Sequence, residues 1–139
     1  MKEGERKIKV LFVCTGNSCR SQMAEGWANH LGAGLVEAYS AGVYPVGVAP
    51  LTVKVMAEAG VDISHQRAKA VDEFLGEEFD YVITLCDNVR ELCPYFPDAA
   101  KRFHWPVKDA FGLDLDAYRR ARDEIRARVE AFLNEINGP

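Results

Sequence analysis

Cys14 and Arg20 are two residues of this sequence whose types and spacing could support chemistry. An apolar run of strand type ends at Cys14, five residues follow, and Arg20 then opens a segment with the pattern of an amphipathic helix. Backbone N–H groups that converge at the start of a helix can hold a tetrahedral oxyanion, and the same field stabilises a thiolate. A guanidinium adds a planar fork of donors that fits two oxygens of such an anion. The pattern therefore predicts a nucleophilic thiol within an anion-binding loop.

The loop between these two residues is polar, and we expect its members to bind the anion. The expected binding residues are Thr15, Gly16, Asn17, Ser18, Cys19, Arg20 and Ser21. The two common glycine-rich nucleotide motifs do not occur at this loop, so a small oxyanion is the better ligand. The alternative is that Cys14 is core filler and Arg20 a surface cation. A glycine, an asparagine and two hydroxyls between them make a poor core pattern, which favours the functional interpretation.

Three further residues are candidates to act with Cys14. Cys86 follows a second apolar run, Cys93 lies seven positions later, and Asp109 follows a short candidate strand. Zinc is disfavoured because this second cysteine pair is too widely spaced and an arginine beside the first pair serves no metal. We therefore expect no metal site. What remains is thiol–disulfide exchange, in which a second thiol attacks an adduct on Cys14 and a third carries the disulfide onward.

The bulk composition limits the class of protein. The chain has 139 residues, of which 48% are hydrophobic, and this predicts one domain over residues 1–139 with a core that needs neither disulfide nor metal. A formal net charge of −4 without a long basic stripe argues against binding nucleic acid. The apolar run after the charged N-terminus is too short for a signal peptide or a membrane span. We expect a cytoplasmic, monomeric protein with reduced cysteines.

The elements that must position these residues alternate between strand and helix. Apolar periodicity predicts strands over residues 8–13, 35–40, 80–85 and 102–105, helices over 23–31, 51–59 and 115–136, and a helical turn at 71–75. This alternation favours an α/β fold, a three-layer sandwich around a four-stranded parallel sheet. In strand order 2-1-3-4 the reversal lies between the first and third strands, where ligands bind in such sheets. Cys14, Cys86 and Asp109 would then emerge at one edge.

Several motifs occur here in an order typical of one family. They are Cys14-Thr-Gly-Asn-Ser-Cys-Arg20-Ser21, Tyr39-Ser-Ala-Gly42, Val82-Ile-Thr-Leu-Cys86, Cys93-Pro94, His104-Trp105 and Arg122-Asp-Glu-Ile125. On these motifs, which run nearly end to end, the chain resembles the thioredoxin-coupled arsenate reductases. Those proteins share the fold of the low-molecular-weight protein tyrosine phosphatases, and the cysteines at 86 and 93 are what indicate the reductase.

The resemblance implies roles at the loop. Cys14 is expected to attack arsenate held by the loop amides and Arg20, while Asp109 acts as general acid to the departing oxygen. Ser21 is expected to hydrogen-bond the thiolate, and Asn17 to shape the loop. Phosphate and sulfate are further anions for the same site.

The resemblance also implies a redox relay. Cys86 attacks Cys14, arsenite leaves, and Cys93 takes over to give a Cys86–Cys93 disulfide. Thioredoxin, as an external partner, reduces that disulfide, so no bound cofactor is expected.

Two departures from the family accompany the resemblance. Asp109 is followed by Ala110 where a proline is common, which predicts a less rigid acid loop. Some relatives bind potassium near the loop through residues that include positions matching Glu25 and Ser40 and an aspartate where this chain has Lys69. A lysine there could supply the charge of the cation itself, so we expect no potassium dependence here.

Two other functions are compatible with the same residues. One is a phosphatase that hydrolyses phosphotyrosine or aryl phosphates through a phosphorylated Cys14, because arsenate and phosphate present the same tetrahedral anion to the loop. The other is a module that binds an oxyanion or senses redox state without catalysis.

Overall fold

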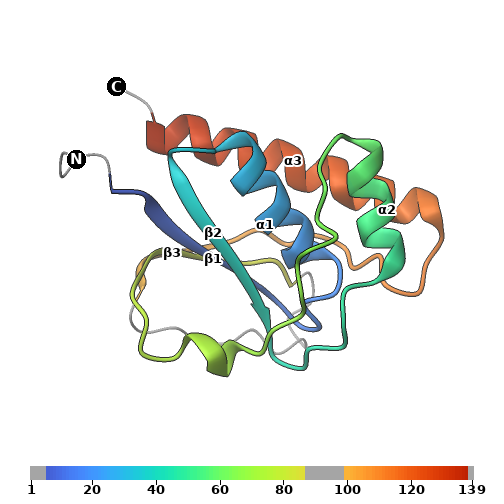
Figure 1. The fold of residues 1–139 in the computed structure, drawn as a ribbon, viewed down its shortest axis with the longest axis horizontal. Helices are drawn as coiled ribbons and strands as arrows, with labels where there is room; N and C mark the ends of the chain where they lie inside the picture. Colours follow the sequence, from blue (N-terminus) through green and yellow to red (C-terminus); the bar gives the residue numbers. More distant parts are fainter. Residues whose placement is uncertain (1–5, 87–98, 138–139) are drawn as a thin grey trace.

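Strands and helices alternate along the chain in the computed structural model, which describes residues 6–86 and 99–137 (Figure 1). The strands are β1 (Ile8–Cys14), β2 (Val36–Gly42), β3 (Phe79–Thr84) and β4 (Ala99–His104). The helices are α1 (Arg20–Leu31), α2 (Pro50–Glu58) and α3 (Leu115–Asn137), and the short 3-10 helix η2 (Val71–Phe74) precedes β3. Each predicted strand and helix is therefore present, with some bounds displaced.

The four strands form one parallel sheet in the order β2-β1-β3-β4. Val13 of β1 pairs with Ala41 on one side and with Thr84 on the other. Val10 to Val13 are all fully buried, as expected for a central strand covered on both faces. The predicted order 2-1-3-4 is confirmed, and the strand order reverses between β1 and β3.

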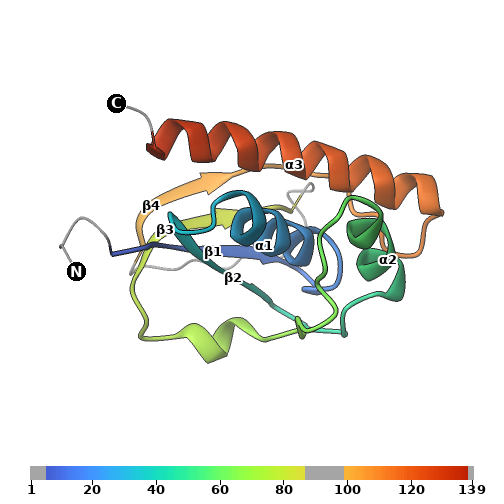
Figure 2. The same ribbon diagram turned by 45° about the horizontal axis from the view of Figure 1, so that its top comes forward.

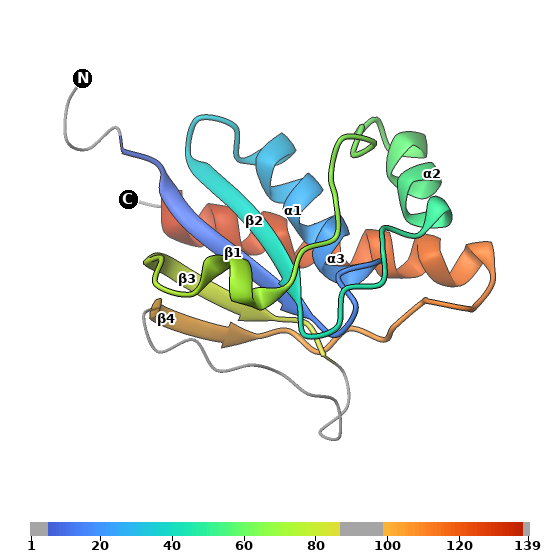
Figure 3. The same cartoon turned by 60° about the horizontal axis from the view of Figure 1, so that its bottom comes forward.

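The side chains of β1 alternate between two apolar clusters on opposite faces of the sheet. Val10 and Phe12 belong to the larger cluster, with residues of α1 and α3, whereas Leu11 and Val13 pack with Phe74 of η2. Figures 2 and 3 show α1 and α3 together on one face and η2 on the other. The predicted layered α/β architecture is thus confirmed, and η2 belongs to the layer on the face opposite α1 and α3.

Helix α3 is held against the rest of the molecule along one apolar stripe. Its buried residues recur at helical spacing and are Ala117, Tyr118, Ala121, Ile125, Val129, Phe132 and Leu133. Trp27 of α1, which is 1% exposed, donates from Nε1 to the Arg122 carbonyl at 3.2 Å. Replacing a buried tryptophan by alanine costs about 3–5 kcal/mol, so this contact is a substantial part of the helix layer. Among the described helices, none combines the length and apolar character needed to cross a bilayer.

Two bounds differ from the sequence-based prediction for identifiable reasons. Helix α1 begins at Arg20, ahead of the predicted Met23, because its first turn is polar yet buried and apolar periodicity cannot detect such a turn. Strand β4 begins at Ala99, ahead of the predicted Arg102, because Ala99 pairs with Phe79 of β3. In both cases tertiary contacts extend the element beyond its apolar pattern.

Candidate active site

The loop over residues 15–19 connects the end of β1 to the start of α1 at the carboxyl edge of the sheet. Cys19 is the N-cap residue of α1 and makes no side-chain capping hydrogen bond, so the amides of the first turn are donors suited to an oxyanion. Asn17 has a φ of 49°, in the left-handed region, and this turns the loop back on itself. A Cβ added at Gly42 would lie 2.7 Å from the Thr15 carbonyl oxygen, so a glycine there lets β2 approach the loop closely.

The side chain of Asn17 is the centre of the hydrogen-bond network that shapes the loop. Its Oδ1 accepts from the backbone N–H of Lys69 at 2.8 Å and from Gln22 Nε2 at 2.9 Å. Its Nδ2 donates to Ser21 Oγ at 2.7 Å and to Ser40 Oγ at 3.0 Å. Because the Lys69 backbone is necessarily the donor in its bond, the orientation of the amide follows. Asn17 is fully buried and has all four hydrogen bonds made.

The same network brings Ser21 to the thiol. Ser21 Oγ accepts from Asn17 and lies 2.9 Å from Cys14 Sγ, in a hydrogen bond for which either atom can be the donor. The contact is buried, with Cys14 only 2% exposed. A thiolate can only accept, so once Cys14 is ionised the Ser21 hydroxyl is the donor, and hydrogen bonds to a charged acceptor are the stronger ones. The predicted contact between Ser21 and Cys14 is therefore present.

Arg20 joins three segments that are far apart in the sequence. Its side chain is 1% exposed, and Nη1 donates to the carbonyl oxygens of Leu85 and Val107, each at 3.1 Å. Its Nη2 lies 3.4 Å from Asp109 Oδ2. The guanidinium therefore fixes the end of β3 and the acid-bearing loop relative to the anion loop, in addition to the anion contact predicted from the sequence.

Asp109 lies beside Arg20 and remains partly open to solvent. Its side chain is 44% exposed, and its Oδ1 accepts from the backbone N–H of Phe111 at 3.1 Å. A carboxyl group at the rim, close to the loop that holds the thiol, is placed to exchange a proton with a bound anion. Cys14, Cys86 and Asp109 all follow the carboxyl ends of strands of this sheet, as the topology predicted, and Arg20 joins Asp109 to the loop.

A buried ion pair lies behind the loop. Lys69 Nζ is 3.6 Å from Glu25 Oε1, and both side chains are largely buried. Ser40 donates to Glu25 and accepts from Asn17, which connects this pair to the network around Cys14. Burial raises the pKa of Glu25 above its ordinary value, while the hydrogen bond from Ser40 and the charge of Lys69 act in the opposite direction. The family resemblance had already grouped positions 25, 40 and 69 as a potassium site of some relatives, and here Lys69 places a positive charge beside Glu25.

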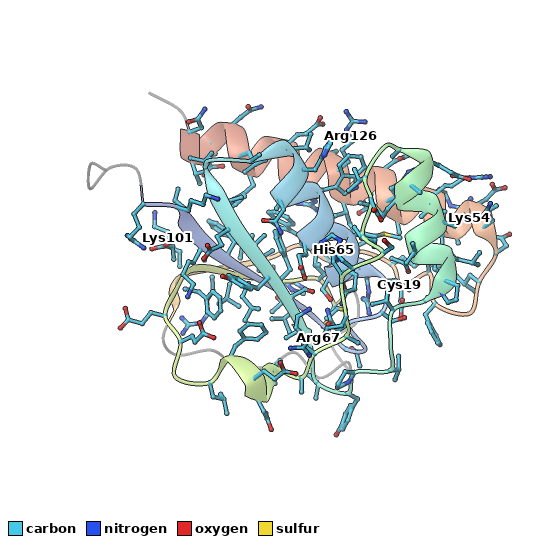
Figure 4. The ribbon with its side chains drawn as sticks, viewed as in Figure 1. Cys19, Lys54, His65, Arg67, Lys101 and Arg126 are labelled. Carbon is cyan, nitrogen blue, oxygen red and sulfur yellow. The ribbon has the colours of Figure 1, made fainter. Side chains whose placement is uncertain are left out.

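Cys19 is a free thiol that points into the interior. It is 2% exposed and lies between the start of α1 and α2 (Figure 4). Burial raises the pKa of Cys19, against hydrogen bonds with Thr52, Tyr118 and Ser18 that act to lower it. Cys19 is therefore suited to packing and hydrogen bonding within the protein, and only its backbone lies in the anion loop.

The two relay cysteines differ in what the structure describes. Cys86 is 1% exposed and comes directly after Leu85, whose backbone N–H donates to the Val13 carbonyl at 2.9 Å. This hydrogen bond continues the β1–β3 ladder to the residue before Cys86. Cys93 lies outside the described residues. Within the described ranges, no group of three or more His, Cys, Asp or Glu side chains is arranged to hold a metal ion.

Two site contacts were not predicted from the sequence. Gln22 bonds both Asn17 and the Arg67 carbonyl, and Tyr118 contacts Cys19. Gln22 lies in α1 and Tyr118 in α3, and the Arg67 carbonyl and Cys19 that they reach are distant along the chain. For Gln22, a polar residue in the first turn of α1 was the only local signal.

Comparisons with known proteins agree with this geometry. Residues 9–138 match the family of low molecular weight phosphotyrosine protein phosphatases. The arsenate reductase of Halalkalibacterium halodurans is 43% identical over 132 residues, which are 91% of this chain and 95% of that protein. A solved structure of an arsenate reductase in the phosphate binding state has a TM-score of 0.85 at 38% identity, covering 93% of this chain and 98% of the other.

A thioredoxin-dependent arsenate reductase from Corynebacterium glutamicum is also similar. Its TM-score is 0.76 at 28% identity, and the match covers 94% of this chain and 62% of that one. The match to the family covers nearly the whole chain, and the similar proteins named here are arsenate reductases. The chain therefore belongs to the low molecular weight phosphotyrosine protein phosphatase family and, within it, to the arsenate reductases.

Proposed function

We propose that this protein reduces arsenate to arsenite through an adduct on Cys14 and a disulfide relay among Cys14, Cys86 and Cys93 that thioredoxin regenerates. The observation that carries the proposal is the buried Cys14 thiol, which is hydrogen-bonded to the Ser21 hydroxyl in a loop where Arg20 reaches Asp109. A thiolate, an anion site and an acid at one edge are the components that the first step requires.

The first step forms a bond between sulfur and arsenic. The Cys14 thiolate attacks arsenate held by the loop amides, the S–As bond forms, and one As–O bond breaks. Asp109 gives its proton to the departing oxygen, which leaves as water. The loop amides and Arg20 are placed to stabilise the charge on the remaining oxygens.

The second step is the reduction of arsenic. Cys86 attacks Cys14 Sγ, an S–S bond forms, and the electron pair of the S–As bond stays on arsenic, which leaves as arsenite. Val13 pairs with Thr84, so Cys86 lies one residue beyond the position opposite Cys14. One strand spacing of about 4.8 Å and one residue step of about 3.3 Å give a Cα separation of roughly 6 Å. A disulfide requires about 4.4–6.8 Å, so this spacing supports a Cys14–Cys86 bond.

The third step restores the catalytic thiol. Cys93 attacks Cys86, the Cys86–Cys93 bond forms, and Cys14 leaves as a thiolate. A dithiol partner then supplies the two electrons that reduce this bond. The proposal assigns that task to thioredoxin, and it is supported by the similar protein from Corynebacterium glutamicum that is thioredoxin-dependent.

Cysteine-to-serine variants test the relay in single-turnover reactions without reductant. Cys93→Ser should release about one arsenite per protein and accumulate a Cys14–Cys86 disulfide, detectable by peptide mass spectrometry, because only the third step is blocked. Cys86→Ser should release none. Both variants should lose multiple turnover with thioredoxin, thioredoxin reductase and NADPH. A matched reaction in which a small thiol replaces thioredoxin shows which of the two is the reductant.

Phosphatase activity is the second candidate, because arsenate and phosphate present the same tetrahedral anion to the loop, a similar arsenate reductase has been solved in the phosphate binding state, and the family is named for phosphotyrosine. Hydrolysis of an aryl phosphate needs Cys14, Arg20 and Asp109 but neither relay cysteine, so Cys86→Ser and Cys93→Ser should retain it. If these variants lost hydrolysis yet kept multiple-turnover arsenate reduction, the relay would be wrong. Anion binding without arsenite release from the wild type would instead indicate a non-catalytic module.

A further inference from the structure

We propose that Gln22 is a positioning residue for the anion loop, because its side-chain amide fixes the peptide unit between Asn17 and Ser18. In that position the Ser18 N–H faces the bound oxyanion. The inference rests on the proposed function, in which the loop amides hold arsenate. It gives a task to Gln22, a fully buried polar residue of α1 that the proposed steps do not use.

The backbone carbonyls of residues 15–19 are all hydrogen-bonded to groups around the loop. Four of them accept from backbone N–H groups. The pairs are Thr15 with Tyr44 at 2.9 Å, Gly16 with Val46 at 3.1 Å, Ser18 with Ala49 at 3.2 Å and Cys19 with Met23 at 2.9 Å. The fifth carbonyl, that of Asn17, accepts from Gln22 Nε2 at 3.1 Å. Gln22 therefore does with a side chain what backbone donors do for the rest of the loop.

The direction of these carbonyls decides the direction of the loop amides. A trans peptide unit is planar, so the C=O of one residue and the N–H of the next point in opposite directions. Because the five carbonyls point outward to their donors, the N–H groups of residues 16–20 point toward the inside of the loop. Asn17, with a φ of 49°, has the left-handed conformation that helps successive N–H groups converge on an anion. Release of the Asn17 carbonyl would let this peptide unit rotate and turn its oxygen toward the anion.

The backbone around Gln22 fixes which way its side-chain amide faces. Nε2 lies 3.1 Å from the Asn17 carbonyl and 2.9 Å from the Arg67 carbonyl, and a backbone carbonyl can only accept. The nitrogen is therefore on that side, where it also donates to Asn17 Oδ1 at 2.9 Å. Oε1 faces the other way and accepts from Gln66 Nε2 at 2.7 Å. Gln66 thus holds the Gln22 amide in the orientation that the loop requires.

The burial of Gln22 gives these hydrogen bonds their weight. The residue is 0% exposed, and hydrogen bonds are electrostatically stronger in such low-dielectric surroundings. Without Nε2 the Asn17 carbonyl would lose its donor in the interior, which is costly. Rotation of the peptide unit relieves that cost but places an acceptor where the anion needs a donor. Loss of Gln22 should therefore weaken anion binding as well as stability.

Gln22→Met tests the assignment because methionine has a similar length and no donor. Inorganic phosphate is the probe, since it is a tetrahedral anion that the relay does not reduce. The Kd for phosphate, measured by calorimetry, should rise at least about tenfold, the effect of losing one hydrogen bond to a charged group. In nitrogen-15 NMR spectra the Ser18 amide proton of the wild type should shift downfield when phosphate is added. This shift should be lost in the variant.

Asn29→Leu is the matched control on the same helix. The Asn29 amide makes two hydrogen bonds with the Ala38 backbone, at 3.1 and 2.9 Å, and Ala38 lies four residues before the end of β2. The variant loses contacts of the same kind, so it should unfold at a lower temperature. Because these contacts lie away from the loop, it should keep the wild-type Kd and the Ser18 shift.

Gln66→Met decides the question if Gln22→Met does not fold. Gln66 is half-buried, and its loss removes the hydrogen bond that orients the Gln22 amide, so the Kd for phosphate should rise about threefold. A wild-type Kd and Ser18 shift in Gln22→Met, or in Gln66→Met where the first variant does not fold, would overturn the proposal. Equal losses in Asn29→Leu would also overturn it.

Phosphate binding separates this inference from the proposed function, because it needs no reduction of arsenate. A wild type that binds phosphate but releases no arsenite would refute the proposed function, and the role of Gln22 would still be decided by the Kd and the Ser18 shift. A wild type that binds no phosphate would overturn both.

Discussion

Replacing Arg20 by lysine should destabilise the protein and weaken anion binding together, although the positive charge is retained. Arg20 donates from Nη1 to the Leu85 and Val107 carbonyls, each at 3.1 Å, and its Nη2 pairs with Asp109 at 3.4 Å. A lysine ammonium is a point charge on a flexible stem and cannot span these three partners at once. At least one buried carbonyl loses a hydrogen bond to a charged donor.

The magnitude follows from the number of lost contacts. Each hydrogen bond with a charged group is worth about 1.5–3 kcal/mol, and one to two are lost, so Arg20→Lys should reduce the free energy of unfolding by about 3 kcal/mol. For a chain of this size that corresponds to a Tm lower by about 10 °C. Loss of the forked contact to the anion should raise its Kd about 100-fold.

Thermal unfolding with and without arsenate measures both effects. At an arsenate concentration 100 times the wild-type Kd, binding should stabilise the wild type by about 2.7 kcal/mol, and the variant by only about 0.4 kcal/mol. Arg6→Lys is the matched control. Arg6 is largely exposed and its Nη2 lies 3.8 Å from Asp80 Oδ1, so replacing it by lysine should change stability by less than about 0.5 kcal/mol.

Two outcomes would refute this reasoning. One is an Arg20→Lys variant with the Tm of the wild type, which would mean that the carbonyl contacts contribute nothing. The other is a full arsenate-induced rise in Tm in the variant, which would mean that charge alone, rather than the planar fork, holds the anion.

Three further predictions concern other parts of the network. Ser21→Ala should slow alkylation of Cys14 by iodoacetamide about tenfold near neutral pH, because the thiolate loses a hydrogen bond of about 1.5 kcal/mol; an unchanged rate in peptide mass spectrometry would contradict this. A hydrogen bond from Arg119 lowers the pKa of Glu58 from 4.5 to about 2. The ionised Glu58 carboxylate therefore stabilises the folded protein above about pH 4.5, and this stabilisation is lost as the pH falls toward 2. Unfolding midpoints of Glu58→Gln and the wild type should therefore converge over that interval, and a difference that persists at pH 2 would argue against the assignment. Potassium added at constant ionic strength should leave turnover unchanged, because Lys69 already supplies a positive charge 3.6 Å from Glu25; a clear rise would show otherwise.

The sequence by itself determined the features that depend on short-range pattern. The spacing of Cys14 and Arg20 identified the loop, and the alternation of apolar runs predicted a parallel sheet with a reversal beside the first strand. Parallel strands end at one edge, so the placement of Cys14, Cys86 and Asp109 at that edge followed from topology alone. The polar first turn of α1 shows the limit of that pattern, because its residues are buried without being apolar.

Only the tertiary structure decided which partners complete the site. Arg20 bonds carbonyls that lie 65 and 87 positions away, and backbone carbonyls carry no signature in a sequence. Gln22 lies in the first turn of α1, and nothing in that spacing indicates that its amide bonds Asn17 and the Arg67 carbonyl. Periodicity shows which side of a helix is buried, whereas the contacts of a buried polar atom depend on how distant segments pack together.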